Sequence, residues 1–169
     1  MAAAVLLPIT DHREPHLLFT KKTVSVPHHQ GQFSFPGGVV EEGDASRVET
    51  ALREAWEEVR LPASAVEVLG LLDDTETRAT NFIITPVVGI VRDHVDFAPD
   101  GREIERVLEV PLARVRDPAI FRTEIWERNG EPHHVQFYQV SADDVVWGAT
   151  ARILSQFLDL LDEPGAPAR

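Results

Sequence analysis

Short runs of apolar residues recur along the chain and are separated by polar turns, a pattern typical of β-strands. We predict strands over residues 3–9, 16–20, 31–35, 66–73, 81–91, 106–112, 122–127, 133–140 and 145–147. Asn129 and Gly130 lie between two of these runs and predict a tight hairpin turn. The runs are too short and too broken by polar residues to span a bilayer as helices. The pattern therefore predicts a sheet-rich protein without a membrane partner.

Two segments show the helical period instead. Residues 45–60 carry one apolar stripe, formed by Val48, Leu52, Ala55 and Val59. Ser46 and Glu49 fit a capping box at its start, and Asp44 is an alternative cap. Residues 148–162 repeat the helical spacing near the end of the chain. We predict a helix over each segment and a helical turn over 113–117.

This order of elements indicates the fold class. Strands interrupted by one central and one terminal helix imply an α/β fold, with a mixed β-sheet covered by helices on both sides. No internal repeat or long linker divides the chain. We therefore expect a single domain over residues 1–162 and a flexible tail over residues 163–169.

Composition and charge exclude several classes of partner and chemistry. The sequence has 169 residues and a net charge of −12, with 16 basic against 28 acidic residues, so no basic face is available for nucleic acid. It contains no cysteine, which excludes disulfides, thiolate metal sites and a cysteine nucleophile. The first residues lack a basic segment and reach Asp11 early, so we interpret them as a strand and not as a signal peptide. A cytoplasmic protein is the expectation.

Seven carboxylates are concentrated between residues 41 and 58. Among them, Glu54, Glu57 and Glu58 are related by i, i+3 and i+4, so they share a helical face with Cβ atoms about 5–6 Å apart. Like charges at this distance repel, and a divalent cation would offset the repulsion, because Mg²⁺ prefers oxygen ligands. From the helix alone, a solvated acidic face with Arg53 as its partner is the alternative interpretation.

A glycine turn precedes the carboxylate helix. Phe35-Pro36-Gly37-Gly38 ends a predicted strand, and its two glycines allow the backbone to approach a ligand closely. At this point the sequence resembles the Nudix family, whose box reads G-x5-E-x7-R-E-U-x-E-E-x-G-U with U aliphatic. The segment REAWEEVRL, residues 53–61, matches the second half of the box in register. Gly38 lies one residue further upstream than the generic spacing, and the early acidic position falls near Asp44.

The longer spacing is similar to that of the coenzyme A pyrophosphatase subfamily. Its upstream signature, L-L-T-x-R-[SA]-x3-R-x3-G-x3-F-P-G-G, resembles LLFTKKTVSVPHHQGQFSFPGG at residues 17–38. Three positions depart from the family pattern. Pro27 replaces the second signature arginine, Arg60 replaces the box glycine, and Asn81 stands where glycine is common. We expect Arg60 to lie at the helix exit in a left-handed conformation costing about 1 kcal/mol, and Asn81 to tolerate such geometry.

The resemblance implies a metal site on the helix. Glu54, Glu57 and Glu58 would bind Mg²⁺ or Mn²⁺, together with the Gly37 carbonyl. Arg53 would orient a helix glutamate instead of touching substrate. The bound metals would neutralise a diphosphate and polarise its phosphoryl oxygens. Glu57, Glu58 and Arg53 would thus belong to the catalytic set as well.

Residues outside the helix would complete the site. The resemblance implies Glu103 as the general base, with Glu105 as the neighbouring alternative. Lys22 stands where the signature has arginine, and strand alternation directs Lys21 to the opposite face. The resemblance implies contacts with substrate from Lys22, His29, Gly31 and Gly38.

The implied fold is the Nudix α/β/α sandwich, and the implied reaction is hydrolysis of a nucleoside diphosphate linked to another moiety. Coenzyme A is the expected substrate, giving 3′,5′-ADP and 4′-phosphopantetheine. The alternatives are a Nudix enzyme for ADP-ribose, NADH, nucleotide sugars or dinucleoside polyphosphates, and a Nudix domain that binds nucleotide without hydrolysing it. The intact glutamate cluster argues against the second alternative. The expected partner is a small-molecule nucleotide, and a homodimer is possible.

Overall fold

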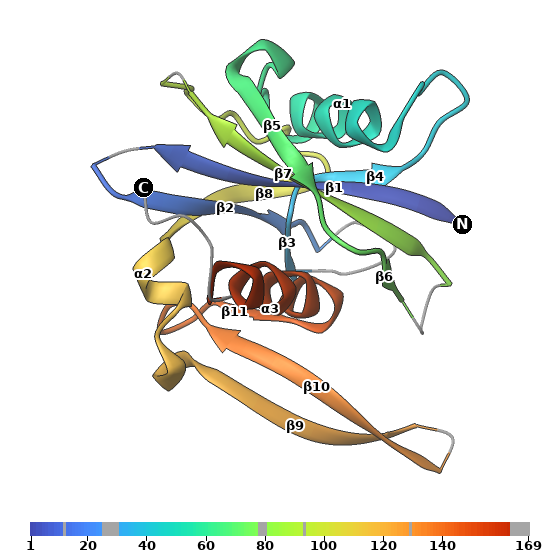
Figure 1. Cartoon of the computed structure of the whole chain (residues 1–169), viewed down its shortest axis with the longest axis vertical. Coiled ribbons are helices and arrows are strands. Elements are labelled where there is room, and N and C mark those ends of the chain that lie inside the picture. Colours follow the sequence, from blue (N-terminus) through green and yellow to red (C-terminus); the bar gives the residue numbers. More distant parts are fainter. Residues whose placement is uncertain (12, 25–30, 78–80, 93, 129, 163–169) are drawn as a thin grey trace.

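The computed structural model describes residues 1–169 apart from 12, 25–30, 78–80, 93, 129 and 163–169 (Figure 1). The expected tail, His29 and Pro27 therefore lie outside the described residues. The strands are β1 (Ala2–Asp11), β2 (Pro15–Lys22), β3 (Phe33–Ser34), β4 (Gly37–Val39), β5 (Val66–Leu71), β6 (Thr75–Glu76), β7 (Ile83–Val91), β8 (Ile104–Pro111), β9 (Phe121–Arg128), β10 (Glu131–Gln139) and β11 (Val145–Trp147). The α-helices are α1 (Arg47–Val59), α2 (Leu112–Val115) and α3 (Gly148–Asp162), and short 3₁₀ helices span Ala63–Ala65 and Pro118–Ile120.

Strands β1 to β8 form one mixed sheet. Its main order is β3-β2-β1-β7-β5, with β4 also paired to β1, β6 to β7 and β8 to β2. Strands β1 and β7 are parallel, whereas the other pairs of this sheet are antiparallel. The remaining strands form a second antiparallel sheet in the order β11-β10-β9. Its β9–β10 hairpin extends away from the body of the molecule (Figure 1), and Gly130 in its turn has φ 79°.

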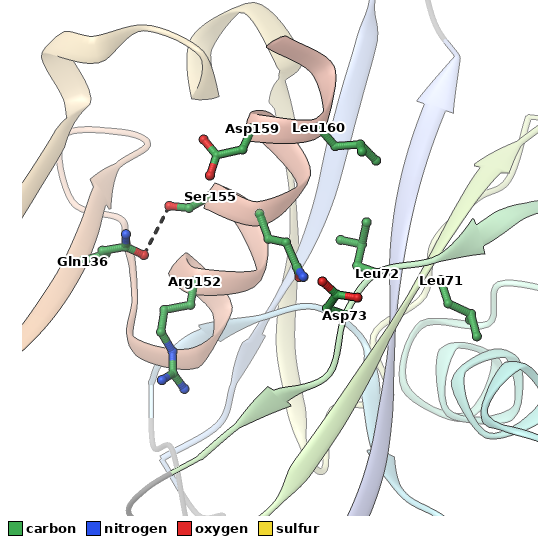
Figure 2. Close-up of a pocket in the computed structure, with 9 residues that line it drawn as sticks. Leu71, Leu72, Asp73, Gln136, Arg152, Ser155, Asp159 and Leu160 are labelled. Atoms are coloured by element: carbon green, nitrogen blue, oxygen red, sulfur yellow. Dashed lines mark hydrogen bonds between the residues drawn. The ribbon is translucent and has the colours of Figure 1, made fainter. Parts of the chain in front are cut away.

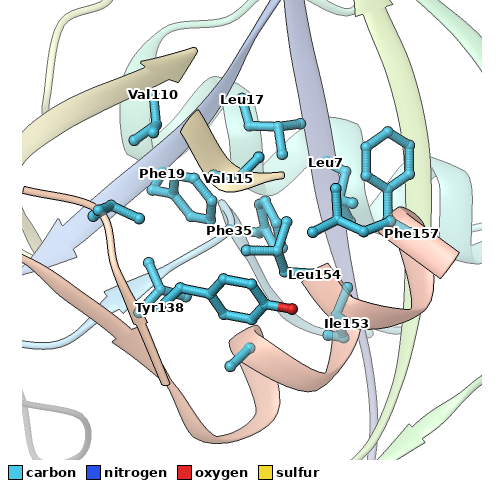
Figure 3. Packing of buried hydrophobic residues seen from close by; sticks show 14 of the residues in the cluster. Leu7, Leu17, Phe19, Phe35, Val110, Val115, Tyr138, Ile153, Leu154 and Phe157 are labelled. Atoms are coloured by element: carbon cyan, nitrogen blue, oxygen red, sulfur yellow. The ribbon is translucent and has the colours of Figure 1, made fainter. Parts of the chain in front are cut away.

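Helices cover both faces of the main sheet, with α1 on one side and α3 on the other (Figure 1). Alternation along β1 explains this arrangement, because Ala4 and Leu6 pack in the cluster under α1 while Leu7 packs in the cluster under α3. Figure 3 shows the cluster under α3, in which Phe19 and Phe35 stack with ring centroids 4.7 Å apart. The expected α/β sandwich is confirmed. Within the described part of the chain, no helix is long and apolar enough to cross a membrane.

Helix α1 begins and ends as its sequence predicts. The Ser46 hydroxyl accepts the Glu49 N–H at 3.1 Å, and the Glu49 carboxylate accepts the Ala45 N–H. At the other end Arg60 is left-handed, with φ 61°, and donates its N–H to the carbonyl of Trp56 at 3.0 Å. The left-handed geometry is confirmed, and Asn81 is left-handed as well, with φ 54°.

The segment before α1 differs from the prediction. The strand expected over residues 31–35 is reduced to β3, and the chain then forms β4 at the glycine pair instead of ending there. Gly37 and Gly38 lie opposite Val5 and Ala4 of β1. A Cβ atom on Gly37 would lie 2.4 Å from the Ala4 carbonyl oxygen, so only glycine permits this approach. The glycine pair is thereby fixed between β1 and α1.

Candidate active site at the glycine strand and helix α1

The glycine strand and α1 touch through Gly38 and Glu54. A Cβ atom on Gly38 would lie 2.3 Å from Oε1 of Glu54, a distance that real contacts do not reach. The missing side chain therefore leaves the space that the Glu54 carboxylate fills. Burial raises the pKa of Glu54, and the neighbouring Arg53 charge opposes that shift. A carboxylate thus lies directly against half-buried backbone that carries no side chain.

Glu58 lies one helical turn further along and is almost fully buried, with 4% of its surface exposed. Its Oε2 accepts the Gly37 N–H at 3.2 Å, and its Oε1 accepts a hydrogen bond from Nζ of Lys22 at 3.1 Å. Burial raises the pKa of Glu58 to about 7, although the Lys22 ammonium pulls it down. The sequence places Glu58 on an acidic face but gives no sign that this face turns inward.

Arg53 is held by several groups at once. Its Nε and Nη2 donate to the two carboxylate oxygens of Asp44 at 3.0 Å, and Nη2 also donates to the Val39 carbonyl at 3.0 Å. Its Nη1 donates to Oε1 of Glu54 at 3.0 Å and to Oε1 of Glu57 at 3.5 Å. The Arg53 guanidinium therefore lies where it can orient Glu54, as the resemblance implies.

Asp44 belongs to this group of residues. Its sequence position predicts only a helix cap or the early acidic position of the Nudix box. Its side chain is 6% exposed and accepts from Arg53, Thr50 and the Glu41 N–H. The hydrogen bond from Arg53 holds the pKa of Asp44 well below its usual range. Asp44 thus anchors Arg53, and the only signal for it in the sequence was the acidic position of the box.

The three helix glutamates do not gather into one group. Glu57 has a side chain that is 54% exposed, against 17% for Glu54 and 5% for Glu58. Among the described residues, no set of three acidic or histidine side chains is close enough to hold a metal ion as it stands. The pair Glu54–Glu58, beside a backbone without side chains, is nevertheless an oxygen-rich donor set that fits a hard divalent cation.

Of the predicted residues outside the helix, Lys22 and Glu103 lie at the same end of the sheet. Lys22 pairs with Ile104 across β2 and β8, and the carbonyl of Glu103 accepts the Thr23 N–H at 2.8 Å. The Glu103 residue itself is exposed. Lys21 turns away and bonds Glu105 at 3.4 Å, which confirms the expected alternation of the two lysines. These contacts place Glu103 in the loop next to Lys22.

Asp100 organises that loop and was not anticipated. Its Oδ1 accepts the N–H groups of residues 102, 103 and 104 at 2.8 to 3.1 Å, and its own N–H donates to the Glu58 carbonyl at 3.0 Å. The loop before β8 is therefore fastened to the end of α1. Gly31 has φ 65° and donates its N–H to the carbonyl of Lys22 at the end of β2.

A separate hollow lies on the α3 side of the sheet. Its volume is about 500 Å³, and it is lined by residues of α3, of β10 and of the segment Leu71–Asp73 (Figure 2). Inside it Ser155 bonds Gln136 at 3.2 Å. None of the predicted site residues that the structure describes lines this hollow. It is therefore distinct from the carboxylate site.

Comparison with known proteins identifies the family of the chain. The family model described as "NUDIX domain" matches residues 1–141. The chain is 39% identical over 156 residues to the protein named "Uncharacterized Nudix hydrolase NudL" from Escherichia coli K12, covering 91% of this chain and 79% of that protein.

Two solved structures share the fold. The Nudix hydrolase RenU from M. Smegmatis superposes with a TM-score of 0.66 at 16% identity, covering 99% of this chain and 89% of that one. A C. elegans Ap4A hydrolase gives a TM-score of 0.56 at 18% identity, covering 66% and 80%. The expected Nudix sandwich is thus confirmed. Since the family model spans most of the chain and the Escherichia coli relative is similar over nearly all of it, the chain belongs to the Nudix family and is a pyrophosphohydrolase of nucleoside diphosphate derivatives.

Proposed function

We propose that the enzyme hydrolyses coenzyme A to 3′,5′-ADP and 4′-phosphopantetheine. The observation that carries this proposal is the position of Lys22, whose ammonium lies beside the Glu54–Glu58 pair while Lys21 faces away. A substrate with a phosphate beyond its diphosphate calls for a cation supplied by the protein near the reaction site. Lys22 stands where the similar subfamily has arginine, and residues 17–38 follow the spacing of that subfamily's signature.

The donor groups near Gly37 support a divalent cation, and Mg²⁺ or Mn²⁺ is the proposed identity. Glu54 and Glu58 would hold it, with Glu57 and the Gly37 carbonyl as further ligands. When bound, such a cation polarises the diphosphate oxygens and lowers the pKa of bound water.

The protein's own groups have defined tasks in this proposal. Arg53, anchored by Asp44, keeps the Glu54 carboxylate in place. Glu103 would take a proton from water as the water oxygen bonds to one phosphorus of the diphosphate. The bond from that phosphorus to the bridging oxygen breaks, and the other phosphate leaves with the bridging oxygen. Gly38, whose missing side chain leaves space for the Glu54 carboxylate, lets that ligand lie against the backbone. Positioning and charge neutralisation then supply most of the rate.

A substrate panel tests the proposal. Purified enzyme is incubated with coenzyme A, dephospho-coenzyme A, ADP-ribose, NADH, a nucleotide sugar and a dinucleoside polyphosphate, each with Mg²⁺ and with Mn²⁺, and products are identified by mass spectrometry. We expect the highest kcat/KM for coenzyme A, with modest preference over dephospho-coenzyme A because lysine lacks the bidentate fork of arginine. Cleavage of ADP-ribose without cleavage of coenzyme A would refute the substrate and leave the Nudix chemistry intact.

A further inference from the structure

Lys22 and Arg53 neutralise the carboxylate pair in different ways. Arg53 keeps Asp44 and the Val39 carbonyl as partners whatever happens to Glu54. Among the described residues, the contact of the Lys22 ammonium is with Glu58, and the two side chains are 18% and 5% exposed. A cation arriving at Glu58 would therefore leave Arg53 in place but would meet the Lys22 charge directly.

The ammonium and a divalent cation draw on the same carboxylate. Glu58 offers Oε1 to Lys22 at 3.1 Å while Oε2 is taken by the Gly37 N–H. Two cations sharing one carboxylate at such distances repel each other strongly in a water-poor site. Lysine can respond, because its charge lies on a flexible four-carbon stem that remains partly exposed. The strand register also shifts between Lys21 and Lys22, an irregularity of the kind that re-aims side chains.

We propose that Lys22 is a displaceable counter-ion, which neutralises Glu58 in the metal-free protein and leaves it when a divalent cation binds. This inference rests on the metal site of the proposed function. Displacement frees the ammonium next to the metal, where an anionic substrate can accept it. Metal binding therefore also releases the Lys22 ammonium for contact with substrate phosphate. The buried Glu58 has a positive partner in both the metal-free and the metal-bound protein.

The sequence makes the test unusually direct, because Lys21 and Lys22 are the only two lysines in the chain. The protein is treated briefly with a limiting amine-acylating reagent in EDTA and in saturating Mg²⁺, and modification at each lysine is quantified by peptide mass spectrometry. In EDTA we expect Lys22 to react roughly tenfold more slowly than Lys21, because an ammonium in a partly buried charge-assisted hydrogen bond must first leave it. Mg²⁺ should abolish most of that difference by accelerating Lys22 alone.

Two variants and a binding measurement complete the design. In Glu58→Gln, Lys22 should react rapidly in both conditions. By calorimetry, Lys22→Gln should bind Mg²⁺ roughly tenfold more tightly than wild type, since its competitor is gone. The matched variant Lys21→Gln removes the same charge one residue away and should leave the Mg²⁺ affinity nearly unchanged.

The outcomes separate the two proposals. If Mg²⁺ binds to wild type but the reactivity of Lys22 does not rise, displacement is overturned while the metal site stands. Equal Mg²⁺ affinities of Lys22→Gln and wild type would overturn it as well. If calorimetry detects no binding of Mg²⁺ or Mn²⁺ to wild type, the metal site of the proposed function fails, and this inference fails with it.

Discussion

Glu58 combines burial, a hydrogen bond from backbone and an ion pair in one side chain, so its removal tests the site at the scale of a residue. Glu58→Gln keeps the size of the side chain and its hydrogen-bonding ability but loses the charge. We expect kcat to fall by roughly 10²–10³-fold, the scale seen when one charge-stabilising group is removed. Steady-state kinetics at saturating metal, with circular dichroism to show that the variant is folded, measures this effect.

Glu42→Gln is the matched control for that variant. Glu42 belongs to the same acidic segment but is exposed and lies outside the positions that match the Nudix box. The same chemical change there should leave kcat within experimental error of wild type. Near-normal turnover in Glu58→Gln would remove Glu58 from the site, and an equal loss in both variants would point to general electrostatics instead.

Lys22 decides substrate preference if the coenzyme A proposal is right. With metal saturating, Lys22→Ala should raise KM for coenzyme A about tenfold, equivalent to about 1.4 kcal/mol of lost binding. KM for dephospho-coenzyme A should barely change, because that substrate lacks the 3′-phosphate. Lys21→Ala should affect neither substrate, since Lys21 points to Glu105. An equal rise in KM for both substrates would show that Lys22 does not recognise the 3′-phosphate.

At the scale of elements, local patterns predicted local structure well. The apolar stripe and the Ser46 cap predicted α1, and the left-handed conformation expected for Arg60 at the end of the helix is present. The pairing of β4 with β1 was missed, because a two-glycine segment has no side-chain period and its partner lies far away in sequence. The inward turn of Glu58 was missed for the same reason, because its partners Lys22 and Gly37 lie on distant strands. Such contacts arise only when the sheet brings distant segments together.

The exit of α1 offers a stability test that is separate from the chemistry. Arg60 has φ 61° and stacks its guanidinium over Trp56 at 5.5 Å from the ring centroid. Arg60→Gly and Arg60→Ala both lose that contact, but only glycine relieves the left-handed strain. We therefore expect the glycine variant to exceed the alanine variant by about 1 kcal/mol in free energy of unfolding.

Urea denaturation of the two Arg60 variants measures the difference, and kcat for both should remain close to wild type. If the two variants are equally stable, the left-handed residue carries no strain of this size. A large fall in kcat without loss of stability would instead assign Arg60 a chemical role.

At the scale of the whole molecule, the main sheet separates the larger hydrophobic cluster from the carboxylate site. Its α3 side holds the larger hydrophobic cluster, whereas its α1 side combines a smaller cluster with the carboxylate site at one end. The net charge of −12 would repel a diphosphate substrate at long range. The site opposes that field locally with Arg53, with Lys22 and, in the proposed function, with bound divalent cation. Removing the cation should consequently lower the stability of the folded protein as well as its activity.

Removal of metal should make stability depend on pH through Glu58. Its folded pKa of about 7 exceeds the usual glutamate value near 4.5, so the folded protein binds the extra proton between those two pH values. Stability of the EDTA-treated protein should therefore fall as pH rises through this window, and the full penalty should be present above pH 7. Glu58→Gln lacks the penalty and should be more stable than wild type by roughly 1–3 kcal/mol above pH 7, with the gap closing toward pH 4.5. Urea denaturation at several pH values measures the gap, and adding Mg²⁺ should stabilise wild type alone. A gap that stays constant with pH would show that the Glu58 carboxylate does not carry this cost.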